Sequence, residues 1–196
     1  GTVQIGGGFQ GRDATIRNAE TLRIDDGALV AADAVGSGTG GTVILWSDGT
    51  TEFAGMVSAR GIEKGGFAEI SGKSTLDITG DVDLTATSGK GGMLLLDPTD
   101  ITISSIGANG LGGSTISNVW ISGLLDAGTD VVIATNFGSG GAGDINIGRL
   151  TSTLEAKSDS IEWYQDAAGI VGGTLTLLAM GDIRFNVPVH SAGEGG

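Results

Sequence analysis

The chain of 196 residues has the length of one domain, and 39% of its residues are hydrophobic but only 5% aromatic, which indicates a core of modest aliphatic side chains. Its 10 basic and 23 acidic residues give a net charge of −13, which disfavours nucleic acid and anionic membranes as partners. The absence of cysteine excludes disulfides and thiolate metal sites, and no apolar run reaches the roughly 20 residues of a membrane-spanning helix.

The first predicted elements are short strands. Val3 and Ile5, and later Leu22 and Ile24, alternate with other residues, and a period of two places one face of a strand in a core. Glycine, with 38 residues against 2 prolines, lies mainly between such runs, where turns need conformational freedom. We therefore expect many short strands joined by many turns.

The segment 40–103 contains an internal repeat. Gly-Gly pairs begin at positions 40, 65 and 91, so successive pairs are 25 and 26 positions apart. A shift of 25 positions aligns apolar residues with apolar residues: Val43 with Ala68, Leu45 with Ile70, Phe53 with Ile78, Val57 with Val82, and Ala59 with Leu84. About three short strands fit into one such repeat, whereas the i, i+3, i+4 spacing of a helical solenoid is absent.

Each repeat is therefore predicted to be one coil of a parallel β-helix, stacked on the next coil at about 4.8 Å. Equivalent inward side chains should form buried columns, and the expected columns are Val43/Ala68/Leu94, Leu45/Ile70/Leu96 and Phe53/Ile78/Ile103. Val82 should also be buried, while Glu52, Asp77 and Asp83 should point outward.

Beyond residue 103 the strand rhythm continues with longer gaps. The expected strand residues are Val131, Ile133, Ile145, Ile147, Leu154, Ile161, Leu175, Leu177, Ile183, Phe185 and Val187. The segment 117–127 breaks this pattern and predicts a short helix, with Asn118 as N-cap and Gly128 just past its end. No linker divides the chain, so we expect a single domain over 1–196, with its best-defined coils at 40–103.

Three strings carry a family resemblance: GGTVILWSDGTTEFAGMVSARG at 40–61, GGFAEISGK at 65–73 and GGMLLLDPTDITI at 91–103. They resemble the secreted adhesins of the filamentous haemagglutinin type, which are exported by two-partner secretion, and similar segments occur in many large bacterial exoproteins. The resemblance covers nearly the whole chain and implies a right-handed parallel β-helix, in agreement with the crossover rule. It also implies an extracellular or cell-surface location and an outer-membrane transporter as secretion partner, but no particular ligand. A secretion region is not recognisable here, so we expect any export signal to lie elsewhere in a longer precursor.

Enzymes with a parallel β-helix place carboxylates beside a basic residue on one outer sheet. Asp81 and Asp83 share a strand face, and Asp97 and Asp100 flank Pro98, but no basic residue is next to either pair in the sequence. In so acidic a chain, carboxylate pairs are expected by chance, so we interpret both pairs as solvated surface residues and not as catalytic groups.

The other candidate residues have structural interpretations as well. Arg184 alternates with apolar residues as an outward strand residue, and His190, the single histidine, is expected on the surface. The segment 140–148, GGAGDINIG, differs from calcium-binding nonapeptides and occurs once, so we expect a turn leading into a strand at 144–147. One member of Trp163-Tyr164 should face solvent. The sequence therefore predicts no catalytic, cofactor-binding or metal-binding residue, and no enzyme.

One stacked pair of carboxylates raises a cation hypothesis. The repeat places Glu52 over Asp77, about 4.8 Å apart, and like charges at that distance repel. A divalent cation, Arg60 or Lys73 would offset the repulsion, and screening by solvent is the alternative.

Two classes of function remain. The first is a structural or adhesive shaft of a secreted surface protein, whose open ends stack on adjacent coils of the precursor or on identical copies in a filament. Glycans or the surfaces of host or neighbouring cells are further possible partners. The second class is a carbohydrate-active enzyme, a polysaccharide lyase or hydrolase, which needs a groove with carboxylates and a base.

Overall fold

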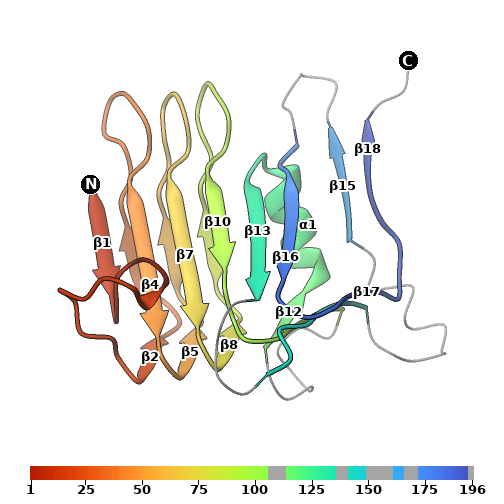
Figure 1. The fold of residues 1–196 in the computed structure, drawn as a ribbon. Helices are drawn as coiled ribbons and strands as arrows, with labels where there is room; N and C mark the ends of the chain where they lie inside the picture. Colours follow the sequence, from red (N-terminus) through yellow and green to blue (C-terminus); the bar gives the residue numbers. More distant parts are fainter. Residues whose placement is uncertain (106–113, 136–140, 149–160, 166–171, 194–196) are drawn as a thin grey trace.

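A computed structural model of the protein describes residues 1–105, 114–135, 141–148, 161–165 and 172–193. The described chain is mostly β, and every strand pair in it is parallel, which confirms the all-β class predicted from the sequence. Figure 1 shows the strands of successive repeats side by side, with the N-terminal strand at one end of the row and β18 at the other.

The largest sheet has six strands in the order β1-β4-β7-β10-β13-β16. Its strands are β1 (Thr2–Ile5), β4 (Thr42–Ser47), β7 (Phe67–Gly72), β10 (Met93–Leu96), β13 (Asp130–Thr135) and β16 (Leu175–Ala179). Each strand comes from a later part of the chain than its neighbour before it, so the sheet collects one strand from every repeat.

Smaller sheets run beside it. One contains β2 (Thr21–Ile24), β5 (Thr50–Phe53) and β8 (Thr75–Ile78), and another β3 (Leu29–Ala31), β6 (Met56–Ser58) and β9 (Asp81–Asp83). The later strands are β12 (Thr115–Ser117), β11 (Ile101–Ser104), β14 (Ile145–Ile147) and β17 (Ile183–Phe185), in that order, and the pair β15 (Ile161–Gln165) and β18 (Val189–Gly193). In the central repeats the chain visits the three sheets in turn, and one such pass is called a rung below.

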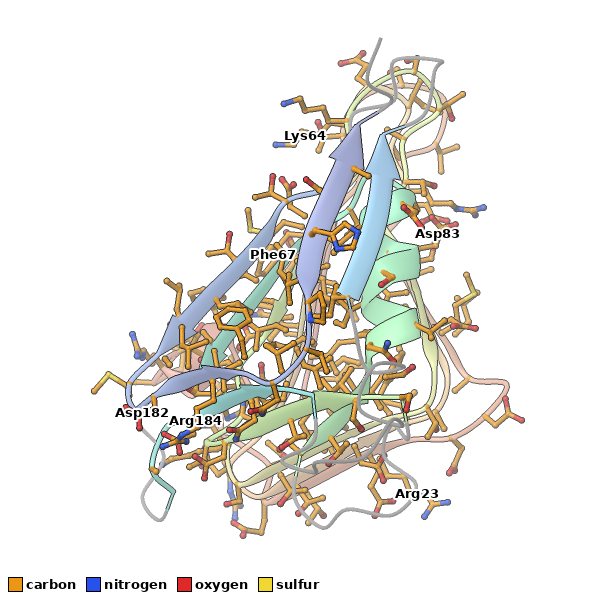
Figure 2. The ribbon with its side chains drawn as sticks, turned by 90° about the vertical axis from the view of Figure 1, so that its right-hand side faces the viewer. Arg23, Lys64, Phe67, Asp83, Asp182 and Arg184 are labelled. Atoms are coloured by element: carbon orange, nitrogen blue, oxygen red, sulfur yellow. The ribbon has the colours of Figure 1, made fainter. Side chains whose placement is uncertain are left out.

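The register of the central rungs follows the predicted columns. Val43 pairs with Ala68 and Ala68 with Leu94, while Leu45 pairs with Ile70, and all five side chains are fully buried. Seen along the stack, apolar side chains fill the space between the sheets (Figure 2). Two further predictions hold in part: Phe53 pairs with Ile78, both buried, whereas Val82 is only half-buried.

The predicted extension of the Phe53/Ile78 column to Ile103 is wrong. Strand β11, which carries Ile103, pairs with β12 on one side and β14 on the other, so it has no free edge for β8. The neighbour of β8 is instead the start of β12, where Leu76 N donates to Ser114 Oγ at 3.0 Å. A strand from later in the chain thus lies between two rungs, and its buried Ile116 fills the core at that level.

The Gly-Gly pairs mark the place where backbones of successive rungs approach most closely. A Cβ atom on Gly66 would lie 2.2 Å from the carbonyl oxygen of Gly41, and one on Gly92 would lie 2.0 Å from that of Gly66. No side chain fits at either distance, because the contact is with backbone of the neighbouring rung. The glycine repeat is therefore a requirement of close stacking.

The predicted helix is present as α1 (Asn118–Asp126), packed against β12, β13 and β15. Its N-cap is Ser117, whose hydroxyl accepts a hydrogen bond from Trp120 N, and not Asn118, which is already the first helical residue. Gly128, predicted to follow the end of the helix, has a φ of 80° and donates to Leu125 O.

Candidate functional site

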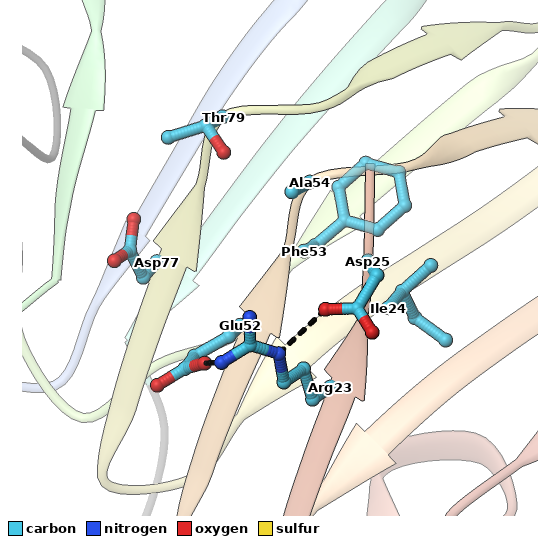
Figure 3. A pocket seen from close by; sticks show the side chains of 8 residues that line it. All are labelled: Arg23, Ile24, Asp25, Glu52, Phe53, Ala54, Asp77 and Thr79. Atoms are coloured by element: carbon cyan, nitrogen blue, oxygen red, sulfur yellow. Dashed lines mark hydrogen bonds and ion pairs between the residues drawn. The ribbon is translucent and has the colours of Figure 1, made fainter. Parts of the chain in front are cut away.

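A column of charged side chains lies on the outer face of the β2-β5-β8 sheet. The register pairs Arg23 with Glu52 and Glu52 with Asp77, so one such residue comes from each of three successive rungs. Alternation along each strand directs them outward, while Phe53 beside them faces the core with 1% of its surface exposed. Together with Asp25 and Thr79 they line a shallow pocket of about 130 Å³ (Figure 3).

Arg23 makes two ion pairs in this pocket. Its Nε lies 2.6 Å from Asp25 Oδ1 and its Nη1 lies 3.2 Å from Glu52 Oε2. The basic residue that offsets Glu52 is therefore Arg23, and neither Arg60 nor Lys73, the two residues that the sequence predicts for this role. Arg60 instead pairs with Asp33 at 2.8 Å, just past the ends of β6 and β3.

Asp77 is the least hydrated carboxylate of the column. Loss of hydration, followed by the charge of Glu52, raises the pKa of Asp77 above its ordinary value. Its Oδ1 atom is buried and receives no hydrogen bond. The predicted stacking of Glu52 over Asp77 is thus confirmed, and the repulsion between the two carboxylates contributes to the raised pKa of Asp77.

A second shallow groove, of about 360 Å³, adjoins this pocket. Ala54 and Thr79 line both hollows, and the groove adds the exposed side chains of Leu29 and Met56 and the carboxylate of Asp81. Charged and apolar surfaces therefore lie next to each other along the flank. Such a flank offers shallow contacts to a partner and no deep pocket that encloses a small molecule.

Asp83, the other carboxylate of the predicted Asp81/Asp83 pair, belongs to an ion-pair network with Arg60. Arg60 Nε lies 3.9 Å from Asp83 Oδ2, and Asp83 Oδ1 accepts hydrogen bonds from the backbone and hydroxyl of Thr85. Burial alone would raise the pKa of Asp33, but hydrogen bonds from Arg60 and Ser58 lower it to about 2. This network ties neighbouring rungs together.

The interpretation of Asp97 as a solvated carboxylate is wrong, whereas Asp100 is half-buried. Asp97 is 2% exposed, and its Oδ2 accepts a hydrogen bond from Gln10 Nε2 at 3.0 Å, because the segment that contains Gln10 covers it. Asp100 Oδ1 accepts from the backbone of Gly143 and Asp144, at 2.8 Å each. Both carboxylates join parts of the chain that are far apart in sequence.

The remaining candidates lie at the C-terminal rungs. Arg184 is paired at 2.5 Å with both Asp144 and Asp182, as expected of an outward strand residue, and His190 is exposed as predicted. The predicted strand at 144–147 is observed at Ile145–Ile147. Leu154 and the side chains of Trp163 and Tyr164 lie outside the described residues.

Within the described ranges, no three His, Asp or Glu side chains are grouped so that they could hold a metal ion. No helix in those ranges combines the length and apolar character needed to cross a membrane.

The ion pair of Arg23 with Glu52 could not be predicted from the repeat, because the spacing between equivalent residues is different in the first rung. Arg23 precedes its partner Glu52 by 29 positions, whereas Glu52 precedes Asp77 by 25, so a search at 25 positions does not align Arg23 with the column. The signal that could have found Arg23 is its position between two inward-facing residues, Leu22 and Ile24, which matches the position of Glu52 between Thr51 and Phe53.

Compared with known proteins, the chain matches no protein-family model and no curated protein.

Proposed function

We propose that the chain is a segment of a right-handed parallel β-helix that serves as a structural or adhesive shaft of a secreted bacterial surface protein. The shaft holds a binding region away from the cell or presents shallow contacts along its flank. It extends end to end, on adjacent rungs of a longer chain or on identical copies in an extracellular filament. The resemblance of segment 40–103 to adhesins of the filamentous haemagglutinin type supports this function. The same resemblance implies an outer-membrane transporter as the secretion partner.

One observation carries the proposal: inward-facing columns remain exposed at the last rung. Ile101 and Ile145 are buried, but Ile183, which continues their column, is 39% exposed. The next column behaves alike, because Ile147 is fully buried and its partner Phe185 is 58% exposed. A further rung would cover both side chains and bury apolar surface at about 25 cal/mol per Å².

A series of aspartates supports the same extension. Asp144 N donates to Asp100 Oδ1, and in the next rung Asp182 N donates to Asp144 Oδ1, each at 2.8 Å. Asp182 continues the series at the last rung, and its side chain is 70% exposed beside Arg184 (Figure 2). Its carboxylate is thus placed to accept the corresponding backbone N–H of one more rung.

The test is sedimentation velocity over a series of protein concentrations. We expect the sedimentation coefficient of the wild type to increase with concentration, because head-to-tail contacts do not close. The double variant Ile183→Asp/Phe185→Asp should lose this increase. Leu29→Asp is the matched control, since Leu29 is similarly exposed but lies on the flank.

Circular dichroism first establishes that both variants are folded. The shaft proposal is contradicted if the wild type sediments identically at every concentration, or if Leu29→Asp and the double variant lose association equally.

A carbohydrate-active enzyme is the second candidate, and the column of Arg23, Glu52 and Asp77 favours it. A carboxyl group with a raised pKa beside a second carboxylate and an arginine is the kind of arrangement that acid–base cleavage of a polysaccharide needs. Release of reducing ends or unsaturated sugars from polysaccharides, abolished by Asp77→Asn but not by Asp81→Asn, would establish this activity. Absence of product from every polysaccharide class tested would favour the shaft alone.

A further inference from the structure

Residues 6–20 form a strap that connects β1 to β2 and crosses the outer face of the six-stranded sheet. In Figure 1 the strap passes in front of β4. It contains a short 3-10 turn, Phe9–Gly11, and Gly11 lies so close to Trp46 that a Cβ atom there would be 2.5 Å from the indole ring. Phe9 also contacts Phe67, with ring centroids 5.9 Å apart.

The side-chain amide of Asn18 fastens the end of the strap that leads into β2. Asn18 Nδ2 donates to Gly11 O at 2.9 Å and to Asp48 Oδ1 at 3.0 Å, and Asp48 Oδ1 also accepts from Trp46 Nε1 at 3.1 Å. The strap is therefore a packed cover with several specific contacts to the sheet.

A fully buried carboxyl group lies beneath the strap. Glu69, on β7, is 0% exposed although its side chain is on the outer face, since its register neighbours Ile44 and Leu95 also point there. Both of its oxygens lie 3.1 Å from the backbone nitrogen of Gln10. Gln10 has a φ of 52°, a left-handed conformation that no other non-glycine residue adopts in the described part of the chain. This unusual backbone directs the N–H of Gln10 at Glu69.

Few groups stabilise a negative charge on Glu69. The groups that face it are the Gln10 N–H and the Arg12 side chain from the strap, Ser71 from its own strand, and Asp97 from the rung after it. Loss of hydration is the largest effect on the pKa of Glu69. The hydrogen bond from the Gln10 N–H and the nearby Ser71 hydroxyl lower the pKa, while the negative charge of Asp97 raises it by more than the positive charge of Arg12 lowers it. The pKa of Glu69 is raised from 4.5 to about 7.

We propose that the strap is an acid-locked cover, in which Glu69 holds the strap closed when protonated and loosens it when ionised. Opening the strap would return Glu69 to water and restore its ordinary acidity. A carboxyl group whose pKa is raised in the closed state favours closure fully below pH 4.5 and progressively less up to about pH 7. The strap is thus tightest in acid, and its release uncovers outer-face side chains of the sheet, among them Trp46 and Phe67.

The size of the effect follows from the two pKa values. Each pH unit between them multiplies the opening equilibrium constant tenfold, so opening increases about a hundredfold between pH 4.5 and pH 7 and then becomes constant. The variant Glu69→Gln carries no charge at any pH. Its strap should therefore open as rarely at pH 8 as that of the wild type does in acid.

Hydrogen exchange of the backbone amides, corrected for the intrinsic rate at each pH, measures this opening. The informative amide is Ala19 N, which donates to Gly6 O within the strap. At pH 8 we expect about a hundredfold more protection in Glu69→Gln than in wild type, and equal protection near pH 4.5. Glu63→Gln, an exposed glutamate in a turn, is the matched control and should match the wild type.

Equal protection of wild type and Glu69→Gln at pH 8 would overturn the proposal. So would lower protection in the variant, because it would show that the ionised carboxylate holds the strap. If Glu69→Gln does not fold, the wild type alone decides: strap amides should lose protection between pH 4.5 and pH 7 while amides of β13 do not. Constant strap protection over that range contradicts the lock.

Discussion

Replacing Gly66 by alanine perturbs the stacking of rungs at a single atom. The new Cβ would lie 2.2 Å from Gly41 O, so the two rungs must separate locally by roughly 1 Å to reach an ordinary contact. That shift weakens the hydrogen bond from Phe67 N to Gly41 O, now 2.9 Å, and the one from Met93 N to Gly66 O, now 3.0 Å. Overpacking costs about 1–3 kcal/mol and each buried hydrogen bond lost costs about 1–3 kcal/mol. We therefore expect Gly66→Ala to lower the free energy of unfolding by about 3–5 kcal/mol.

Gly123→Ala is the matched control for this experiment. Gly123 lies in α1, and an added Cβ would meet no atom within 4 Å apart from the neighbouring backbone of its own helix. Alanine should therefore raise the free energy of unfolding by about 0.5–1 kcal/mol. Denaturant unfolding followed by far-ultraviolet circular dichroism measures both changes. If Gly66→Ala is as stable as the wild type, the two rungs do not approach each other closely enough to exclude a Cβ atom at position 66.

Three further predictions concern the core and the flank column. Leu45→Ala should lower the free energy of unfolding by about 2–5 kcal/mol, because it leaves a cavity in a fully buried site. Leu29→Ala, at an exposed site, should change it by less than about 0.5 kcal/mol. Equal losses of the two variants in denaturant unfolding would contradict the buried column. The raised pKa of Asp77 means that its ionised form is disfavoured in the folded chain, so the folded chain loses stability as pH rises above 3.8. The variant Asp77→Asn should therefore have a higher melting temperature than the wild type at pH 7 and the same melting temperature at pH 3. The control Asp81→Asn should show no such difference. Calcium and chelator should leave the melting temperature unchanged, because Arg23 already offsets Glu52, and an increase with calcium would place a cation in the column.

The central rungs were predictable because two independent signals coincide there. The Gly-Gly pairs fix the rung length between 40 and 103, and the apolar alternation fixes which side chains point inward, so the pairing of Val43 with Ala68 and of Leu45 with Ile70 followed directly. Where the rung length changes, the alternation alone does not determine the neighbour. That is why Ile103 was assigned to the wrong column: the strand beside Ile78 comes from residues 115–117.

The strap was not predicted, for a different reason. The segment of the strap that carries these contacts, GGGFQGRD at 6–13, has neither alternation nor a helical period. Its conformation depends on contacts to distant residues such as Glu69 and Trp46. The same contacts made Asp97 buried against expectation. In the flank column, the pair Glu52 and Asp77 was found from the repeat, but the burial that raises the pKa of Asp77 is a property of three-dimensional packing.

Electron microscopy of the wild-type chain at increasing concentrations tests the central claim, that rungs continue from one segment to the next along one axis. We expect unbranched particles of constant width whose length increases with concentration, since the contact surfaces are the two ends of the stack. Particles of one length at all concentrations, or clusters joined along their flanks, would contradict it.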